Sequence, residues 1–289
     1  DAGFKKLIVT AKHHDGFCIW DSEHTEYDVK ASGYRDASGQ SDILAEISAA
    51  CTKANMDMGL YLSPWDIHDP SYGYYDENHK PTNKENDKLD YNDYYNNQLE
   101  EILGNEKYGN NGHFVEVWMD GAKGSGANAQ EYDFKRWFDT IQKNEGIEAK
   151  YDADCMLFGA EAYTTVRWIG NELGIAGKDT WSKSNVDKQN NTINSNKQGN
   201  ATVGFEDGNQ WTVPEADARI TSGWFWGTQK NTPKTMGELS DMYFNSVGHN
   251  ATLLLNVPPN NQGTVDKAIL ERISKRHLKQ IWQKKKEHL

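Results

Sequence analysis

Long apolar runs and a surplus of basic residues are both missing from this 289-residue sequence. No stretch approaches the ~18 consecutive apolar residues that a membrane-spanning helix needs. Acidic residues outnumber basic ones by 43 to 31, which gives a formal net charge of −12. Phosphate binding needs a basic face, so this balance argues against a nucleic-acid partner. We therefore expect neither a membrane span nor nucleic-acid binding.

Paired cysteines and phosphate-binding loops are also missing. The three cysteines, Cys18, Cys51 and Cys155, are odd in number and lack the spacing of metal ligands. They imply no disulfide framework, and we expect them to be small buried side chains. No G-x-G-x-x-G or Walker sequence follows an apolar run, so a nucleotide-binding sheet loses its main support.

Aromatic residues, by contrast, are plentiful, with 10 Trp and 14 Tyr. Many stand beside polar residues, as in Trp20-Asp21, Trp65-Asp66 and Trp118-Met119-Asp120. Sugar pockets use aromatic faces beside carboxylates and amides, because one face of a pyranose ring is apolar and the rest is hydroxyl. The pattern is equally compatible with tryptophan as a large core residue.

Short apolar runs alternate with amphipathic segments along the chain. Strands are expected at 7–12, 59–64, 113–120, 155–160, 219–226 and 252–259. Helices are expected at 41–55 with Ser41 as N-cap, at 92–103, 130–143 and 236–247, and from 269 through His277. This alternation is typical of a parallel α/β architecture. Residues 177–215 are polar, and we interpret them as a long loop over the pocket.

Polar and titratable residues gather where these strands end. His13 and His14 follow the first strand, Trp65-Asp66 follows the second, and Asp120 ends the third. In a (β/α)8 barrel the carboxyl ends of all strands open into one active site. We therefore predict an α/β fold of the TIM-like (β/α)8 barrel type. It is incomplete, because about six strand–helix units are found where a closed barrel needs eight.

Side-chain alternation in the strand 113–120 places a carboxylate at the rim of this pocket. Successive side chains of a strand point to opposite faces. One face carries Val115, Val117 and Met119. The other face carries Phe114, Glu116, Trp118 and Asp120. The first face suits packing against outer helices, so the second points into the barrel with Asp120 at its rim. Asp120 could also cap the next helix, but its position favours catalysis.

Acid–base chemistry on a sugar needs a second carboxylate. The candidates are Glu161, Glu172 and Glu215. Glu172 is favoured because it follows Trp168 and a turn-forming Gly170-Asn171 pair; the other two stay as alternatives. Two carboxylates about 5–5.5 Å apart would indicate a retaining glycosidase, in which one attacks and the other transfers the proton.

The His13-His14 pair invites a metal interpretation. Adjacent residues on a strand point to opposite faces, so both ligate one ion only if the strand has ended there. No H-x-x-x-H sequence or second pair with metal spacing supports such a site. Hydrogen bonding to substrate hydroxyls is therefore favoured over a metal, and a metal-dependent hydrolase is kept as an alternative.

Five motifs together resemble glycoside hydrolase family 29, the α-L-fucosidases. In chain order they are AKHHDGFCIWDS, GLYLSPWD, EVWMDGAKGSG, VRWIGNE and LLLNVPP. The YLSPWD and RWIGNE forms are most similar to the branch that acts on α-1,3/4-linked fucose in Lewis-type glycans. The resemblance runs from about residue 5 to about residue 275.

This resemblance implies a retaining double displacement that needs no cofactor. Asp120 would be the catalytic nucleophile and Glu172 the general acid/base. Substrate contacts are expected from the same motifs, at His13, His14, Trp20, Asp21, Trp65, Asp66 and Trp118. The implied partner is a fucosylated oligosaccharide or glycoconjugate.

The sequence also departs from the family pattern. Family members carry a stretch before KHHDG that holds the first two barrel strands, and often a β-sandwich after the barrel. Neither is found here, so we expect residues 1–289 to form a single, partial catalytic barrel domain. A non-catalytic fucose- or glycan-binding remnant of a truncated fucosidase is the alternative. Because fucosylated glycans are mostly extracellular, we expect a secreted or cell-surface, or periplasmic, location.

Overall fold

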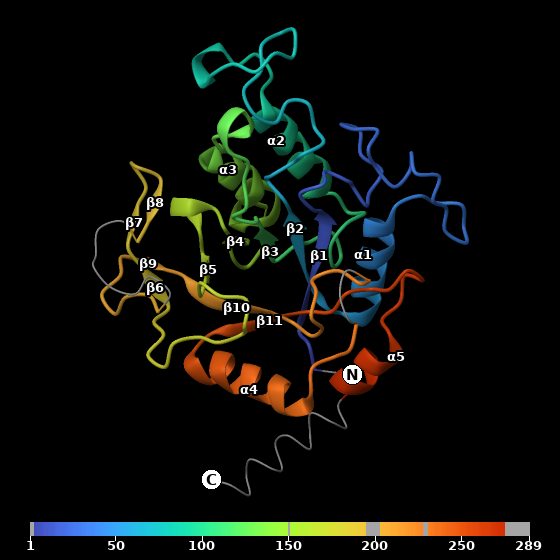
Figure 1. The fold of residues 1–289 in the computed structure, drawn as a ribbon, viewed down its shortest axis with the longest axis vertical. Coiled ribbons are helices and arrows are strands. Elements are labelled where there is room, and N and C mark those ends of the chain that lie inside the picture. Colours follow the sequence, from blue (N-terminus) through green and yellow to red (C-terminus); the bar gives the residue numbers. More distant parts are fainter. Residues whose placement is uncertain (1–2, 150, 195–202, 228–230, 275–289) are drawn as a thin grey trace, which may run out of the picture. The chain divides into compact units, whose positions relative to one another are not determined.

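The computed structural model describes residues 3–149, 151–194, 203–227 and 231–274 (Figure 1). The chain folds into two compact units, one formed by Lys5–Thr164 and the other by Asp1–Phe4 with Thr165–Leu289. Each unit contains its own set of parallel strands. That residues 1–289 form a single catalytic domain stays a prediction.

The first unit, Lys5–Thr164, is built on four parallel strands. In sheet order they are β1 (Lys6–Lys12), β2 (Asp57–Leu62), β3 (Glu116–Trp118) and β4 (Met156–Phe158). The helices that follow the first three strands are α1 (Ile43–Ala54), α2 (Tyr91–Ile102) and α3 (Phe134–Glu145). In Figure 1, α2 and α3 lie side by side, and the two helices contact each other.

All three helices begin at an aspartate whose side chain accepts hydrogen bonds from backbone N–H groups of the first turn. These caps are Asp42, Asp90 and Asp133. Such caps satisfy donors that have no partner within the helix. The predicted cap Ser41 was therefore wrong by one residue, because the carboxylate of Asp42 accepts from the N–H of Ala45.

The core of this unit lies between the strands and the helices. In β2, Met58, Leu60 and Leu62 are fully buried against the helices, so the alternate residue Tyr61 faces the other side of the sheet. The same alternation holds in β3, with Val117 in the core. Phe114, predicted to share a face with Glu116, instead packs in this core because it precedes the regular strand.

The second unit contains three parallel strands, in the order β5 (Val166–Trp168), β10 (Val213–Arg219) and β11 (Thr252–Asn256). A capping box of Thr235 and Glu238 begins α4 (Met236–Ser246). The helix α5 (Lys267–Ile273) follows β11. Two small antiparallel pairs lie between β5 and β10: β6 (Lys183–Ser184) with β9 (Gln210–Trp211), and β7 (Val186–Asp187) with β8 (Thr192–Ile193).

Three expectations for this part of the chain need correction. A strand was predicted at 219–226, but the observed strand β10 runs from Val213 to Arg219 and ends where the predicted one begins. The three-residue strand β5 was missed. The polar segment 177–215 is not only a loop, because it contains the small strand pairs and the start of β10. His277, in the predicted last helix, lies outside the described residues.

The α/β class is confirmed. The parallel strands, with helices after most of them, are consistent with an incomplete (β/α)8 barrel. Within the described ranges, no helix is both long and apolar enough to cross a membrane.

Candidate active site

The carboxylate of Asp120 lies just after β3 and is held by its neighbours in the first unit. Its Oδ2 accepts a hydrogen bond from the phenol of Tyr61 at 2.9 Å, and its Oδ1 accepts from the N–H of Ala122 at 2.8 Å. The side chain is 28% exposed. Asp120 is no helix cap, since α3 is capped by Asp133. A fixed and accessible carboxylate can attack an electrophilic carbon or accept a proton.

Tyr61, which the sequence analysis missed, is the main support of Asp120. Its ring stacks on Trp118, with centroids 5.2 Å apart, and lies parallel to the ring of His13 at 5.7 Å. Burial, reinforced by Asp120, raises the pKa of Tyr61 far above its ordinary value, so the phenol stays a donor. Alternation in GLYLSPWD could have found it, because Leu60 and Leu62 are core residues.

His14 is the second side chain near Oδ2 of Asp120. Its Nε2 is 3.8 Å from Oδ2 of Asp120, and its Nδ1 is 2.7 Å from the hydroxyl of Ser63. The hydroxyl of Ser63 donates its own proton to the carbonyl of Trp65 at 2.7 Å. The hydrogen bond between His14 and Ser63 is therefore donated by the N–H at Nδ1. In the neutral ring Nε2 is then an acceptor, suited to a substrate hydroxyl.

Both histidines at the end of β1 are shifted toward the neutral form. Burial is the main cause that lowers the pKa of His13 and of His14, and Asp120 opposes it in both. For His13 the neighbouring His14, whose ring centroid is 4.0 Å away, lowers the pKa further. The pair therefore offers hydrogen bonds more readily than positive charge.

Aromatic rings form a wall beside these groups. Trp118 is 8% exposed and stacks on Phe158 with centroids 3.9 Å apart. The ring of Trp65 lies 4.9 Å from that of His14. The structure thus brings together five of the predicted site residues: His13, His14, Trp65, Trp118 and Asp120. Such a wall suits the apolar face of a sugar ring.

The other predicted contacts of this unit have different surroundings. Trp20 is fully buried, and its indole N–H donates to Glu101 at 2.8 Å. Asp21 pairs with Lys30 at 2.9 Å and lines a second cavity of about 690 Å³. These contacts give Trp20 a packing role; contact of Trp20 or Asp21 with substrate stays a prediction.

Asp66 is buried and connects two elements of the site. Its Oδ2 lies 3.1 Å from the ammonium of Lys12, the last residue of β1, and its Oδ1 accepts from the N–H groups of His68 and Asp69. Lys12 also donates to Gln98 at 2.8 Å. These bonds fix the loop after Trp65 against the strand that leads to His13-His14.

Gly159 shapes the backbone next to Asp120. It has a φ of +76°, and a Cβ there would overlap the carbonyl oxygen of Met119. The N–H of Met119 in turn donates to the carbonyl of Phe158 at 3.0 Å. Close approach of β4 to the residue before Asp120 therefore requires glycine.

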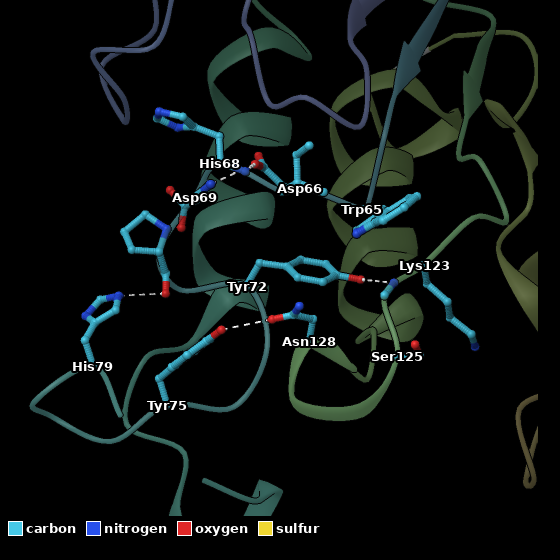
Figure 2. A pocket seen from close by; sticks show the side chains of 13 residues that line it. Trp65, Asp66, His68, Asp69, Tyr72, Tyr75, His79, Lys123, Ser125 and Asn128 are labelled. Carbon is cyan, nitrogen blue, oxygen red and sulfur yellow. Dashed lines mark hydrogen bonds between the residues drawn. The ribbon is translucent and has the colours of Figure 1, made fainter. Parts of the chain in front are cut away.

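Trp65 also lines a cavity of about 480 Å³, shown in Figure 2. Its walls come from 65–79, after β2, and from 123–128, after Asp120. The phenol of Tyr72 accepts from the N–H of Gly124 at 3.2 Å, and that of Tyr75 donates to Asn128 at 3.0 Å. Two loops, one after β2 and one after Asp120, therefore enclose this cavity.

Glu172 belongs to the second unit, in the loop that follows β5. Its Oε2 lies 3.8 Å from the guanidinium of Arg219, at the end of β10, and the side chain is 48% exposed. The indole N–H of Trp168 donates to Asp217 at 2.7 Å beside this loop. Glu172 is therefore accessible to solvent and lies near a cation.

The two alternative carboxylates differ from Glu172 in their settings. Glu215 is 2% exposed inside β10, and its Oε2 accepts from Thr252 at 3.4 Å. Glu161 belongs to the first unit and begins a short 3-10 helix with a φ of +46°. A buried mid-strand group is poorly placed for proton exchange, so the geometry favours Glu172 over Glu215.

Metal ligands do not cluster in the described parts of the chain. No group of three His, Cys, Asp or Glu side chains there could hold a metal ion.

Comparison with known proteins identifies relatives over nearly the whole chain. The family described as alpha-L-fucosidase matches residues 1–280. Alpha-L-fucosidase 1 of Arabidopsis thaliana is 41% identical over 277 residues, which are 95% of this chain and 49% of that protein. A putative alpha-L-fucosidase 1 of Oryza sativa subsp. japonica is 38% identical over 91% of this chain and 45% of its own.

Solved structures agree with this result. A Ruminococcus gnavus GH29 fucosidase in complex with fucose is 85% identical, with a TM-score of 0.92, over 96% of this chain and 55% of that one. The structure of SpGH29 is 42% identical, with a TM-score of 0.81. The chain spans about half the length of the curated relatives that it matches.

Proposed function

The chain belongs to the alpha-L-fucosidase family, and we propose that the protein carrying it is a glycoside hydrolase that releases α-L-fucose from fucosylated glycans. The observation that carries this proposal is the Asp120 carboxylate, oriented by Tyr61 and accessible beside an aromatic wall. The similar Ruminococcus gnavus fucosidase was solved with fucose bound, which supports the same ligand here.

The proposed mechanism is a double displacement with retention. An oxygen of Asp120 attacks the anomeric carbon as the glycosidic C–O bond breaks, and Glu172 donates its proton to the departing oxygen. Glu172 then takes a proton from water, whose oxygen attacks the anomeric carbon and releases Asp120. No cofactor takes part. The exposure of Glu172 beside Arg219 supports its role as the proton carrier.

The neighbours of Asp120 would hold the sugar during these steps. The proposed fucose contacts are Nε2 of His14, the ring of His13, the ring of Trp65 and the small exposed part of Trp118, whose faces are stacked on Tyr61 and Phe158. Direct contacts by Trp20, Asp21 and Asp66 belong to the same proposal. The YLSPWD and RWIGNE motifs support a preference for α-1,3/4-linked fucose, and such substrates favour a secreted or cell-surface location.

The test uses the intact protein with 4-nitrophenyl α-L-fucoside, a Lewis-type trisaccharide and 2′-fucosyllactose. We expect turnover of the first two, an initial product with retained anomeric configuration by NMR, and weak turnover of the α-1,2 linkage. The turnover rate of Asp120→Asn should fall by more than the ~10²–10⁴-fold that is typical for loss of a general acid–base group. Asp139→Asn, on an exposed face of α3, is the control. Unchanged turnover in Asp120→Asn would refute the assignment, and fucose binding without hydrolysis by the wild type would favour a glycan-binding remnant.

A further inference from the structure

We propose that the ion pair between Lys6 and Glu116 positions the Asp120 carboxylate, an inference that rests on the proposed fucosidase function. Lys6 is the first residue of β1, and Glu116 is the first residue of β3. The ammonium of Lys6 donates to Oε2 of Glu116, whose side chain is fully buried, while the side chain of Lys6 is 28% exposed. Glu116 acts here through the strand that leads to Asp120, so it is a positioning residue.

The pair joins two strands that are not neighbours. β2 lies between β1 and β3 in the sheet, and Gly59 of β2 is the registered partner of both Ile8 and Glu116. A Cβ at position 59 would come within 2.9 Å of the Ile8 side chain and 3.3 Å of the Glu116 carbonyl oxygen. Because Gly59 has no side chain, β2 leaves room for Lys6 to reach Glu116.

Glu116 lies on the same face of β3 as the candidate site. Trp118 follows two residues later on that face, and Asp120 follows the end of the strand. The register of the sheet sets the ring of Trp118 between those of Tyr61 and Phe158, at centroid distances of 5.2 and 3.9 Å. Tyr61 in turn donates its hydrogen bond to Asp120. A shift of β3 along its axis would therefore move the carboxylate away from the phenol that orients it.

The strand β3 is short, so its own backbone bonds fix it weakly. It has three residues and pairs with β2 and with β4 through three residues each. A slip of one residue would turn every side chain of a strand to the opposite face of the sheet. The ion pair ties Glu116 to a residue 110 positions earlier in the chain and opposes such a slip.

Stability alone does not account for this pair. Oε1 of Glu116 is buried and has no hydrogen-bond partner among the described residues. Burial raises the pKa of Glu116, and the neighbouring ammonium of Lys6 opposes this rise. Replacing a buried ion pair by apolar side chains of similar volume is often neutral or stabilising, whereas such a pair can specify one arrangement of the chain. The pair therefore fixes the arrangement of β3 rather than supplying much of the folding free energy.

The test separates chemistry from binding in the intact protein. Glu116→Gln keeps the size of the side chain and removes the charge that holds Lys6. We expect kcat for 4-nitrophenyl α-L-fucoside to fall about 10- to 100-fold, because a small misplacement of a reacting group can lower the rate that much. The inhibition constant of free fucose should change far less, since His13, His14 and Trp65, which are proposed to bind the sugar, lie outside β3. Lys6→Arg keeps the ion pair and should keep the wild-type kcat.

Ile141→Val is the control for a simple loss of stability. Ile141 is fully buried in α3, in the core between the strands and the helices, and the change removes one methylene group from that core. Its urea midpoint should fall while its kcat stays at the wild-type value. A purely structural role of Glu116 predicts the same result for Glu116→Gln, namely a lower urea midpoint with the wild-type kcat, and that result would overturn the proposal.

The remaining outcomes are also decisive. An inhibition constant of fucose that rises as much as kcat falls would show a general disruption of the site, and it would refute positioning while leaving the fucosidase function intact. If Glu116→Gln does not fold, the double change Lys6→Met with Glu116→Gln replaces it, because it leaves no buried charge. Its kcat should also fall, and a wild-type kcat would refute the proposal. A wild type that hydrolyses no fucoside would overturn the proposed function and this inference with it.

Discussion

The ammonium of Lys12 lies 3.1 Å from Oδ2 of Asp66, and neither side chain is exposed to solvent. The pair joins the end of β1, which carries the histidines, to the loop that carries Trp65. The centroids of the Tyr94 and Tyr95 rings each lie 5.3 Å from the ammonium, which also donates hydrogen bonds to Tyr91 and Gln98. Two parts of the site are therefore positioned by one buried ion pair.

Asp66→Asn should destabilise the protein strongly. The amide keeps an acceptor for the two backbone N–H groups but leaves the Lys12 ammonium buried without its counter-charge. We expect a loss of about 3–5 kcal/mol in the free energy of unfolding, measured by urea denaturation. Lys12→Met combined with Asp66→Asn should lose less than the sum of the single changes. Strict additivity would show that the pair is not coupled.

Tyr61→Phe should reduce catalysis while the fold is kept. The change removes the hydrogen bond to Asp120 but retains the ring between His13 and Trp118. Hydrogen bonds to charged groups contribute about 1.5–3 kcal/mol, so kcat/KM should fall roughly 10- to 150-fold. The assay uses the aryl fucoside, with near-UV circular dichroism as the check on folding. Wild-type kinetics would mean that this bond does not orient the carboxylate during turnover.

Glu172→Gln should affect substrates according to their leaving groups. Sugar leaving groups need protonation, so trisaccharide hydrolysis should fall by about 10²–10⁴-fold. Fluoride departs without a proton from a carboxylic acid, so the first step with fucosyl fluoride should be much less affected. Glu215→Gln and Glu161→Gln are the matched comparisons. The acid/base role would pass to whichever of them shows this dependence instead.

The free energy of unfolding should decrease as the pH falls below the ordinary histidine value of 6.5. Burial lowers the pKa of both His13 and His14 in the folded protein, so the unfolded chain takes up protons first. Stability is therefore fully present above 6.5 and is lost between that value and the lower folded-state pKa values. Urea titrations at several pH values should show a smaller decrease for His13→Asn. An identical pH dependence in this variant would contradict the depressed pKa of His13.

Sequence patterns predicted most of the helices closely, although the helix expected at 130–143 begins only at Phe134. The helices expected at 92–103 and 236–247 match α2 and α4 within one residue at each end, because apolar periodicity and capping residues act locally. β5 was missed because three residues are too short for a periodic signal. β10 was shifted because Pro214, Glu215 and Asp217 suggest a loop, although the strand is buried for most of its length.

The grouping of the candidate site residues could be predicted from the sequence where they follow a strand end, as for Asp120 and His14; their roles stay predictions. A residue was harder to assign where its role depends on which side chains pack against it in the folded protein. Trp20 and Trp65 each precede an aspartate, yet Trp20 is buried beside Glu101 and Trp65 lines a cavity. Only the tertiary packing separates the two. Tyr61 was overlooked because a tyrosine in an apolar strand has the same pattern as a core residue.

The close approach of Gly159 to Met119 restricts how this site can be re-engineered. Any larger side chain at position 159 would push on the carbonyl next to Asp120, and the positive φ there adds a strain that L side chains rarely accept. Variant libraries aimed at new linkages should therefore leave position 159 unaltered and diversify the exposed ends of the loops instead. The position of the carboxylate that we propose as nucleophile therefore depends on the absence of a Cβ atom at Gly159, the residue that follows β4.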